Sequence, residues 1–252
     1  MATRRALLIS NPGEQGAQNY CQGVFVDIDN YKNYLTSPLG GAWFTSEINS
    51  LNKPTANQVD DEIIKMSGYD YTLILFSGHG YYSQKSLSTI IELNKYEEYD
   101  EMKLRKYATK RTIILDCCRK VYPEKLEKLA EALIMKAEPT LAFDKCRKYF
   151  DIAIDKCSNG TIIGHSCSIN ETSGESETHG GFYASSLLRA ARNWHKQSNY
   201  DPKHYYPNSL AYSVVQTHNS AVPLVGTLSG GTQNPKIDKP RSEPYFPFAI
   251  MA

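Results

Sequence analysis

The sequence predicts an α/β fold in which helices cover both faces of a mostly parallel sheet of about six strands. Two continuous apolar runs, Tyr71–Phe76 and Arg111–Leu115, carry this prediction, because parallel strands buried on both faces read as unbroken apolar segments. Strand and helix patterns also alternate along the chain, which favours parallel strands joined by helical crossovers. The expected architecture is therefore a three-layer α/β/α sandwich.

The individual elements follow from local patterns. Thr55 is the expected N-cap of one helix, because the apolar residues after it recur at helical spacing. The expected strands are Arg5–Ser10, Ala42–Asn49, Tyr71–Phe76, Ser88–Leu93, Arg111–Leu115 and Thr161–Cys167, and the expected helices are Val26–Leu35, Thr55–Met66 and Asp100–Tyr107. The segment 11–16 (NPGEQG) after the first strand matches neither glycine pattern of nucleotide-binding loops.

Composition excludes several classes of protein. The 252 residues carry a net charge of +1 and no polycationic run, so the chain lacks the electrostatic signature of nucleic-acid or anionic-membrane binding. Six cysteines without paired spacing do not suggest a disulfide scaffold, which favours a reducing compartment. The apolar run near the N-terminus is too short for a signal peptide, and no stretch is long enough to span a bilayer. A cytoplasmic location is the expectation.

Two motifs follow the two apolar runs directly. Ser77-Gly78-His79-Gly80 follows the first run, and Asp116-Cys117-Cys118-Arg119 follows the second. The carboxyl ends of neighbouring parallel strands meet at one edge of a sheet, where ligands and catalytic groups gather. An imidazole and a thiol are therefore expected side by side, which is typical of a cysteine hydrolase.

Side-chain alternation assigns the roles within these motifs. Residues two apart share a face of an extended chain, so Asp116 faces with Cys118 while Cys117 points into the core. Cys118 is then the expected nucleophile, with His79 as its base or as a stabilising imidazolium. The backbone N–H groups of Gly80 and Cys118 are candidates for an oxyanion hole.

These residues resemble the caspase and metacaspase family, the caspase-like branch of the clan CD cysteine peptidases. In that family a His-Gly at one strand end and a Cys at the next form the catalytic dyad. Here 39 positions separate the two residues, against roughly 50 in the caspase signature, which a shorter connection explains. Asp116-Cys117-Cys118 is closer to the metacaspase Asp-x-Cys pattern, whereas Arg119 is the caspase-like choice, and the family's glycine two residues after the Cys is missing.

The resemblance covers nearly the whole chain. The segment 23–35 (GVFVDIDNYKNYL) is similar to the metacaspase segment that opens the first helix, with Asp27 on the family's aspartate. Residues 170–173 (NETS), 233–235 (QNP) and 245–250 (YFPFAI) resemble elements of the small-subunit region. The resemblance implies one caspase-like peptidase domain over 1–252, with a large-subunit-like region 1–118, a helical linker 119–160 and a small-subunit-like region 161–252.

The resemblance also implies a substrate preference. Asp27, Ser77 and Asp116 match the pocket with which metacaspases select a basic residue, and no arginine lies between Asn11 and Ile48 to select an acidic one. Paired carboxylates stabilise a guanidinium or ammonium group by charge-assisted hydrogen bonds. The expected substrates are proteins or peptides cleaved after Arg or Lys, with control by a separate activating protein as one possibility.

Other interpretations stay open at this point. His79 and Cys118 are each compatible with a purely structural role, Asp27 with a helix cap, and Asp116 with a structural hydrogen-bond acceptor. A zinc site from Cys146, Cys157, His165 and Cys167 lacks the paired C-x-x-C spacing. The acidic residues after the His motif, Glu92, Glu97, Glu98, Asp100 and Glu101, form no aspartate cluster, so calcium dependence is left open and no required cofactor is expected.

The charged segment between Arg119 and Gly160 has helical spacing at Leu126, Leu129, Leu133 and Ile134. It is expected to form a solvated helical hairpin, with self-cleavage at its basic residues as the lesser hypothesis. Two further classes of function are possible: a catalytically silent caspase-like interaction module, and a clan CD peptidase of different specificity. Chains of this size resemble bacterial stand-alone caspase-like effectors, some of which act in stress or antiviral defence.

Overall fold

The computed structural model describes residues 1–119, 141–197 and 210–252. A six-stranded sheet forms its centre, in the order β12-β8-β7-β3-β1-β2. The strands are β1 (Arg4–Asn11), β2 (Ile48–Asn52), β3 (Tyr71–Gly78), β7 (Lys110–Asp116), β8 (Gly160–His165) and β12 (Lys236–Asp238). All neighbours pair in parallel except β12, which runs antiparallel to β8 at one edge. The predicted mostly parallel sheet is confirmed.

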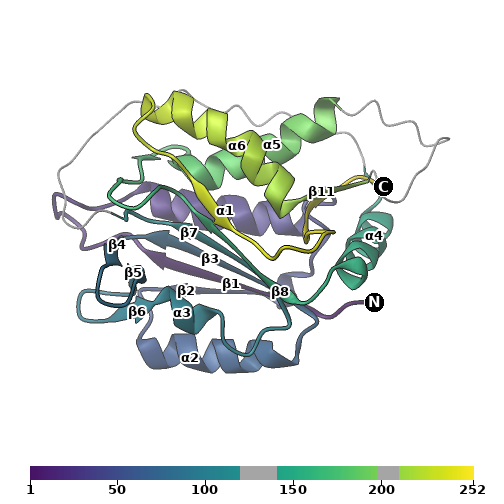
Figure 1. Cartoon of the computed structure of the whole chain (residues 1–252), viewed down its shortest axis with the longest axis horizontal. Coiled ribbons are helices and arrows are strands. Elements are labelled where there is room, and N and C mark those ends of the chain that lie inside the picture. Colours follow the sequence, from purple (N-terminus) through teal and green to yellow (C-terminus); the bar gives the residue numbers. More distant parts are fainter. Residues whose placement is uncertain (120–140, 198–209) are drawn as a thin grey trace.

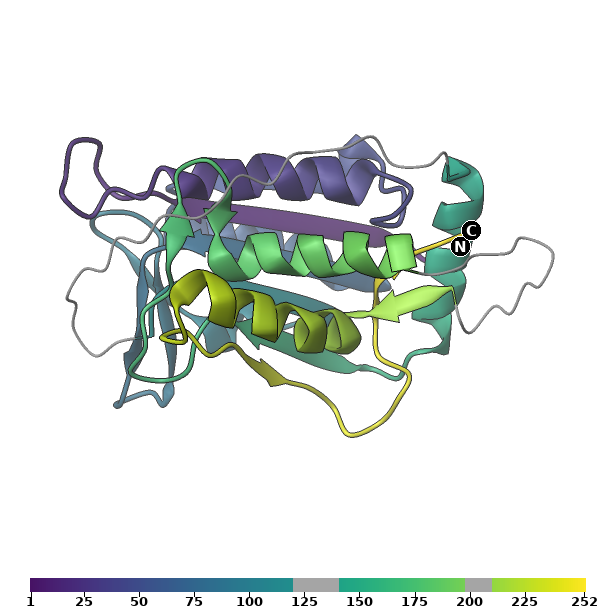
Figure 2. The same cartoon turned by 90° about the horizontal axis from the view of Figure 1, so that it is seen from above.

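Helices cover both faces of this sheet. The three on one face, α1 (Gly23–Thr36), α5 (Phe182–Gln197) and α6 (Val214–Ser229), lie side by side (Figures 1 and 2). On the opposite face lie α2 (Ala56–Lys65) and α3 (Glu101–Leu104) (Figure 1). Helix α4 (Phe143–Lys156) packs at the end of the sheet where both chain termini lie. Within the described residues, no helix combines the length and the apolar character needed to span a membrane.

Two hydrophobic cores result from side-chain alternation along the buried strands. Leu73 and Leu75 of β3 pack toward α1 and α5, whereas Ile74 and Phe76 of the same strand pack toward α2 and α3. Because every second side chain of a strand points to the same face, a strand between two helical layers is apolar at every position. This explains why β3 and β7 read as continuous apolar runs in the sequence.

Three smaller sheets complete the fold. Strands β4 (Gly80–Ser83), β5 (Ser88–Glu92) and β6 (Glu98–Asp100) form an antiparallel sheet that begins directly after β3. This sheet contains the β-excursion predicted at Ser88–Leu93. Strands β9 (Glu175–Ser176) and β10 (Gly180–Gly181) form a hairpin, and β11 (Ala211–Ser213) pairs with β13 (Pro247–Ile250). Two 3-10 helices, η1 (Thr45–Glu47) and η2 (Met66–Gly68), lie in connections.

The predicted strand over Ala42–Asn49 is wrong, since η1 occupies its centre and β2 starts only at Ile48. The Glu47 carboxylate accepts a hydrogen bond from the Phe44 N–H at 2.7 Å and forms an ion pair with Arg147 at 2.6 Å. These contacts fold the segment into a turn that the apolar pattern does not reveal.

Other boundaries shift as well. The helix predicted over Asp100–Tyr107 is the single turn α3, with Asp100 as its N-cap, and Tyr107 has a left-handed φ of 59° that ends any helix. The segment 245–250 contains β13, which pairs with β11 outside the central sheet, while β12 supplies the edge strand. The helical pattern at Leu126, Leu129, Leu133 and Ile134 lies outside the described residues.

The predicted cap at Thr55 offers a test of local stability. Its hydroxyl accepts a hydrogen bond from the Gln58 N–H at 3.3 Å, while the Gln58 side chain accepts one from the Thr55 N–H at 2.8 Å. We expect Thr55→Ala to lower the free energy of unfolding by about 1 kcal/mol, because a helix N–H loses its partner. Urea denaturation measures this, and Thr55→Ser is the control that keeps the cap. Equal stability of the Ala variant and the parent would contradict the assignment.

Candidate active site

The two motifs predicted from the sequence lie at one edge of the sheet. Strands β3 and β7 are hydrogen-bonded neighbours in which Ser77 pairs with Asp116. His79 and Cys118 each follow two residues later, so both leave the same sheet edge. The two segments are in direct contact, since a Cβ added at Gly80 would come within 2.9 Å of the Cys117 sulfur. Glycine at this position therefore allows the His79 segment to pack against the cysteine pair.

The two adjacent cysteines face opposite ways, as alternation predicts. Cys117 is 2 % exposed and belongs to the core under α2. Its N–H donates a hydrogen bond to the Ser166 hydroxyl at 3.2 Å. Cys118 is partly exposed. Its sulfur accepts a hydrogen bond from the Ser173 N–H at 3.4 Å. Burial raises the pKa of the Cys118 thiol, and the Ser173 N–H opposes this rise by stabilising the thiolate.

The His79 imidazole lies against the loop that connects β1 to α1. Its Nε2 atom is 3.8 Å from the sulfur of Cys21, and a Cβ added at Gly13 would come within 2.8 Å of the same atom. The His79 carbonyl accepts a hydrogen bond from the Glu92 N–H at 3.0 Å, which continues the β4–β5 pairing. The ring therefore lies against the loop 12–21, while the His79 backbone leads into the β4–β5–β6 sheet.

Asp27 lies inside α1, on the side that faces the sheet, and is 1 % exposed. The N-cap of this helix is Gln22, so the alternative that Asp27 caps the helix is wrong. One Asp27 oxygen accepts a hydrogen bond from the Ser77 hydroxyl at 2.6 Å, and both oxygens are 3.0 Å from the Gly181 N–H. The structure thus brings Asp27 and Ser77 together, from α1 and β3.

Asp116 is the last residue of β7 and lies next to this pair. It accepts hydrogen bonds from the Ser173 hydroxyl at 2.5 Å and from the Ala184 N–H at 2.7 Å. The glycine strand β10 packs directly over both carboxylates, because a Cβ at Gly180 would collide with Asp27 and a Cβ at Gly181 with Asp116. Only a backbone without side chains fits at this distance from two carboxyl groups.

Burial raises the pKa of both carboxyl groups. Desolvation is the largest cause for each, and the charge of Asp116 adds to the rise at Asp27. Two carboxyl groups that share a buried space resist double ionisation, since like charges repel strongly where water is excluded. A bound cation would remove this penalty, and the pair is therefore suited electrostatically to a guanidinium or ammonium group.

Glu175 is a third carboxylate of this site, and sequence reasoning missed it. It lies on β9, where its side chain accepts hydrogen bonds from the Gly23 N–H and from the Cys21 thiol. Burial, followed by the charge of Asp116, raises the pKa of Glu175 to about 7. The segment 174–177 (GESE) has no apolar periodicity, so only its place just after the predicted NETS element could have drawn attention to it.

Gln233 holds the loop that contacts Cys118. Its amide nitrogen donates to the Ser166 carbonyl at 2.9 Å and to the Ser173 hydroxyl at 3.2 Å, while its oxygen accepts from the Gly174 N–H at 2.9 Å. The side chain is 2 % exposed, so these three bonds satisfy a buried amide. Gln233 therefore positions Ser173 between Asp116 and Cys118.

The residues considered for zinc do not form a site. Cys146 and Cys157 belong to α4 and its C-terminus, near Lys110 at the start of β7, whereas His165 and Cys167 lie at the opposite end of the sheet. In the part of the chain that the structure describes, no group of three or more His, Cys, Asp or Glu side chains is arranged to hold a metal ion. The zinc alternative is contradicted.

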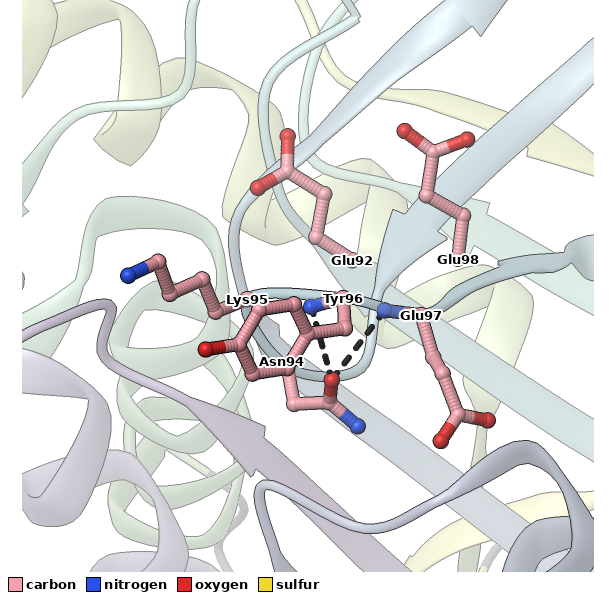
Figure 3. Close-up of a pocket in the computed structure, with 6 residues that line it drawn as sticks. All are labelled: Glu92, Asn94, Lys95, Tyr96, Glu97 and Glu98. Carbon is pink, nitrogen blue, oxygen red and sulfur yellow. Dashed lines mark hydrogen bonds between the residues drawn. The ribbon is translucent and has the colours of Figure 1, made fainter.

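The acidic residues considered for calcium contact protein groups. A pocket of about 230 Å³ lies at the connection between β5 and β6. It is lined by Glu92, Asn94, Lys95, Tyr96, Glu97 and Glu98 (Figure 3). Glu97 accepts a hydrogen bond from the Ala56 N–H at 2.7 Å, which caps α2, and Glu98 accepts one from the Tyr81 hydroxyl at 2.9 Å. Figure 3 shows Asn94 closing the turn through the N–H groups of Tyr96 and Glu97. These carboxylates stabilise the loop beside His79.

A three-layer α/β fold with a thiol and an imidazole at neighbouring strand ends defines a class of cysteine-peptidase-like proteins. The family model described as "Caspase domain" matches residues 3–244, and the chain belongs to this family. Among solved structures, caspase-1 from Spodoptera frugiperda is similar, with a TM-score of 0.59 and 12 % identity over 94 % of this chain and 86 % of that one. The likeness shows that the two share a fold. No curated protein sequence matches the chain.

The raised pKa of Asp27 makes a prediction about stability. A carboxyl group whose pKa is higher in the folded state stabilises the fold at low pH, and this contribution is lost as pH rises through the folded-state pKa. We expect the melting temperature of Asp27→Asn to rise relative to that of the parent as pH increases from 5 to 8. An amide can keep hydrogen bonds to Ser77 and Gly181 without carrying a buried charge.

Melting temperatures of both proteins across this pH range test the prediction. Asp29→Asn is the control, since Asp29 lies on the exposed face of the same helix. If the melting temperatures of the parent and of Asp27→Asn differ by the same amount at all pH values, ionisation of Asp27 does not destabilise the folded state.

Proposed function

We propose that this chain is a cysteine endopeptidase that cleaves after Arg or Lys, with His79 and Cys118 as its catalytic dyad. One observation carries the proposal: the strand ends that bear the imidazole and the thiol lie beside carboxylates from three separate elements, Asp27, Asp116 and Glu175. Membership of the caspase-domain family supports the peptidase class. The substrates are then proteins or peptides.

In the proposed mechanism the Cys118 thiolate attacks the carbonyl carbon of the scissile bond. The N–H groups of Gly80 and Cys118 stabilise the negative charge that develops on the carbonyl oxygen. His79 protonates the leaving amine and then removes a proton from the water that hydrolyses the acyl enzyme. The contact between Gly80 and Cys117 supports this arrangement, because it fixes the His79–Gly80 segment against the cysteine pair.

The carboxylates support the basic specificity. Asp27 and Asp116 together accept hydrogen bonds from two hydroxyl groups and two backbone N–H groups. A carboxylate offers about four lone-pair directions, and the Ser77 and Gly181 donors leave acceptor capacity at Asp27 for a ligand. A cation that binds here attracts both carboxylates, and this Coulomb attraction offsets the cost of burying their charges. Arg gains more than Lys where it binds two oxygens at once.

A second candidate function is a catalytically silent caspase-like interaction module. The raised pKa of Cys118 favours this alternative, since the thiolate is the nucleophile and a protonated thiol reacts slowly. A thiol-directed peptide probe ending in Arg distinguishes the two functions, because it labels Cys118 only if the site binds and activates the peptide.

The nucleophile assignment predicts opposite outcomes for two neighbouring cysteines. We expect Cys118→Ala to lower the cleavage rate of a fluorogenic peptide ending in Arg by at least about 1,000-fold, because no thiolate remains to form the acyl enzyme. Cys117→Ala is the matched control and should keep activity, with circular dichroism to show that it folds.

Peptides ending in Asp, Arg and Lys, assayed side by side with the parent protein, test the specificity. Faster cleavage after Asp would refute the basic preference. An inactive Cys117→Ala beside an active Cys118→Ala would reverse the assignment of the two cysteines.

The specificity assignment also predicts a pH dependence. Because the pKa of Glu175 is about 7, its carboxyl group is neutral below that pH and attracts a basic substrate only above it. We expect kcat/KM for Arg peptides to rise as pH increases through about 7. In Glu175→Gln this rise should be lost, with a decrease of about 10- to 100-fold at pH 8, the value of one charge-assisted hydrogen bond.

Glu177→Gln is the control, since Glu177 lies two positions away on the same hairpin and is exposed. Both variants are compared with the parent over pH 5 to pH 9. An unchanged pH profile in Glu175→Gln would remove Glu175 from the substrate pocket.

A further inference from the structure

The six cysteines of the chain all lie in described residues and all are free thiols. Four of them are buried, and only two, Cys21 and Cys118, are partly exposed. These two exposed thiols lie in the same site, although 97 positions separate them in the sequence. Buried thiols are inert, whereas exposed thiols react with oxidants in solution.

His79 contacts the first of the two thiols. The Cys21 sulfur is 3.8 Å from Nε2 of His79, and His79 leaves the strand next to the one that carries Cys118. The two thiols also interact electrostatically with each other. The loop that leads to Cys21 is exposed from Glu14 to Asn19, and its end is held by a hydrogen bond from the Cys21 N–H to the Pro12 carbonyl at 2.8 Å.

We propose that Cys21 and Cys118 form a reversible oxidative modification site in which a hydroperoxide converts the two thiols into a disulfide. In the first step the Cys118 thiolate attacks the peroxide, the O–O bond breaks, and Cys118 becomes a sulfenic acid while an alcohol or water leaves. In the second step the Cys21 sulfur attacks the Cys118 sulfur, the S–O bond breaks, and water leaves. The peroxide is reduced and the two thiols are oxidised by two electrons in total.

The contacts of the two sulfurs determine the order of the steps. The Ser173 N–H donates to the Cys118 sulfur at 3.4 Å and so stabilises its thiolate. The Cys21 thiol instead donates to the Glu175 carboxylate, and burial together with this negative charge raises the pKa of Cys21. Cys118 therefore reacts with the peroxide first. His79 is placed to accept the Cys21 proton during the second step.

The neighbouring thiols are less suitable partners. Cys117 is 2 % exposed and points into the opposite core, and Cys167 is fully buried, where its thiol donates to the Glu171 carbonyl at 3.4 Å. A disulfide from Cys118 to either would require a buried side chain to leave its packing. Cys21 can reach the site from the exposed side.

The disulfide has three consequences. It removes the sulfur of Cys118 from any substrate, and it withdraws Cys21 from Glu175. It also protects Cys118 from the irreversible sulfinic and sulfonic states, because a sulfenic acid trapped as a disulfide is not oxidised further. The effect on proteolysis rests on the proposed function, whereas formation of the disulfide depends only on the two thiols.

The test is peptide mapping by mass spectrometry of the whole chain after hydrogen peroxide treatment, without reducing agent. We expect a peptide pair linked through Cys21 and Cys118 that separates on addition of dithiothreitol. In Cys21→Ser the link should be absent and Cys118 should accumulate as sulfinic acid. Cys167→Ser is the matched control and should form the link as the parent does.

Activity on an Arg peptide provides a second measurement. After peroxide and then dithiothreitol, the parent should recover most of its initial rate and Cys21→Ser should not. A Cys118–Cys167 link, or equal sulfinic acid at Cys118 in parent and Cys21→Ser, would overturn the proposal. If the parent shows no proteolysis before oxidation, the proposed function fails, and the mapped link alone still decides the disulfide. Should Cys21→Ser fail to fold, as thermal melting would show, the link mapped in the parent and in Cys167→Ser decides it.

Discussion

The parallel register of β3 and β7 is the constraint on which the site depends. Because Ser77 pairs with Asp116 where the β3–β7 ladder ends, the two motifs leave the sheet in the same register, and alternation then assigns their side chains to faces. Ser77 and Asp116 face the α1–α5 layer, while Cys117 faces the layer of α2 and α3. A shift of one residue in this register would bury Cys118 and expose Cys117.

The carboxyl groups of Asp27 and Asp116 show how the fold holds acidic side chains where water is scarce. Asp27 and Asp116 are held by hydroxyl and backbone N–H donors that arrive from β3, β10, α5 and the loop at Ser173. These donors satisfy part of the hydrogen-bonding capacity of each group but supply no full positive charge, so the pKa of both remains raised. Ionising this pair carries an electrostatic penalty, which protonation removes and a bound cation would reduce. The proposed selectivity for basic groups rests on this penalty.

The thiols of the site obey a related rule. Cys117 and Cys167 are buried beneath the strand ends, where the Cys117 carbonyl accepts hydrogen bonds from the Ser166 hydroxyl at 2.9 Å and from the Cys167 thiol at 3.6 Å. Cys21 and Cys118 lie on the outer side. The Ser173 N–H stabilises the thiolate of Cys118, whereas the Glu175 carboxylate raises the pKa of Cys21. The fold thereby separates buried cysteines from partly exposed ones within one end of the sheet. Arg119, the residue after Cys118, adds a buried guanidinium that donates a hydrogen bond to the Cys167 carbonyl at 3.2 Å.

Much of this organisation was determined by the sequence alone. The apolar runs of β3 and β7, the cap at Thr55, and the opposite directions of Cys117 and Cys118 follow from local rules, because alternation and capping depend on residues close together in the chain. The short strand β2 and the single turn α3 did not follow, since the Glu47–Arg147 ion pair and the left-handed Tyr107 override the local pattern. Only the tertiary structure decided which distant loops complete the site. Glu175, Gln233 and Cys21 reach it through chain reversals whose direction is set by packing against the sheet, and no periodicity in a sequence encodes where such a reversal ends.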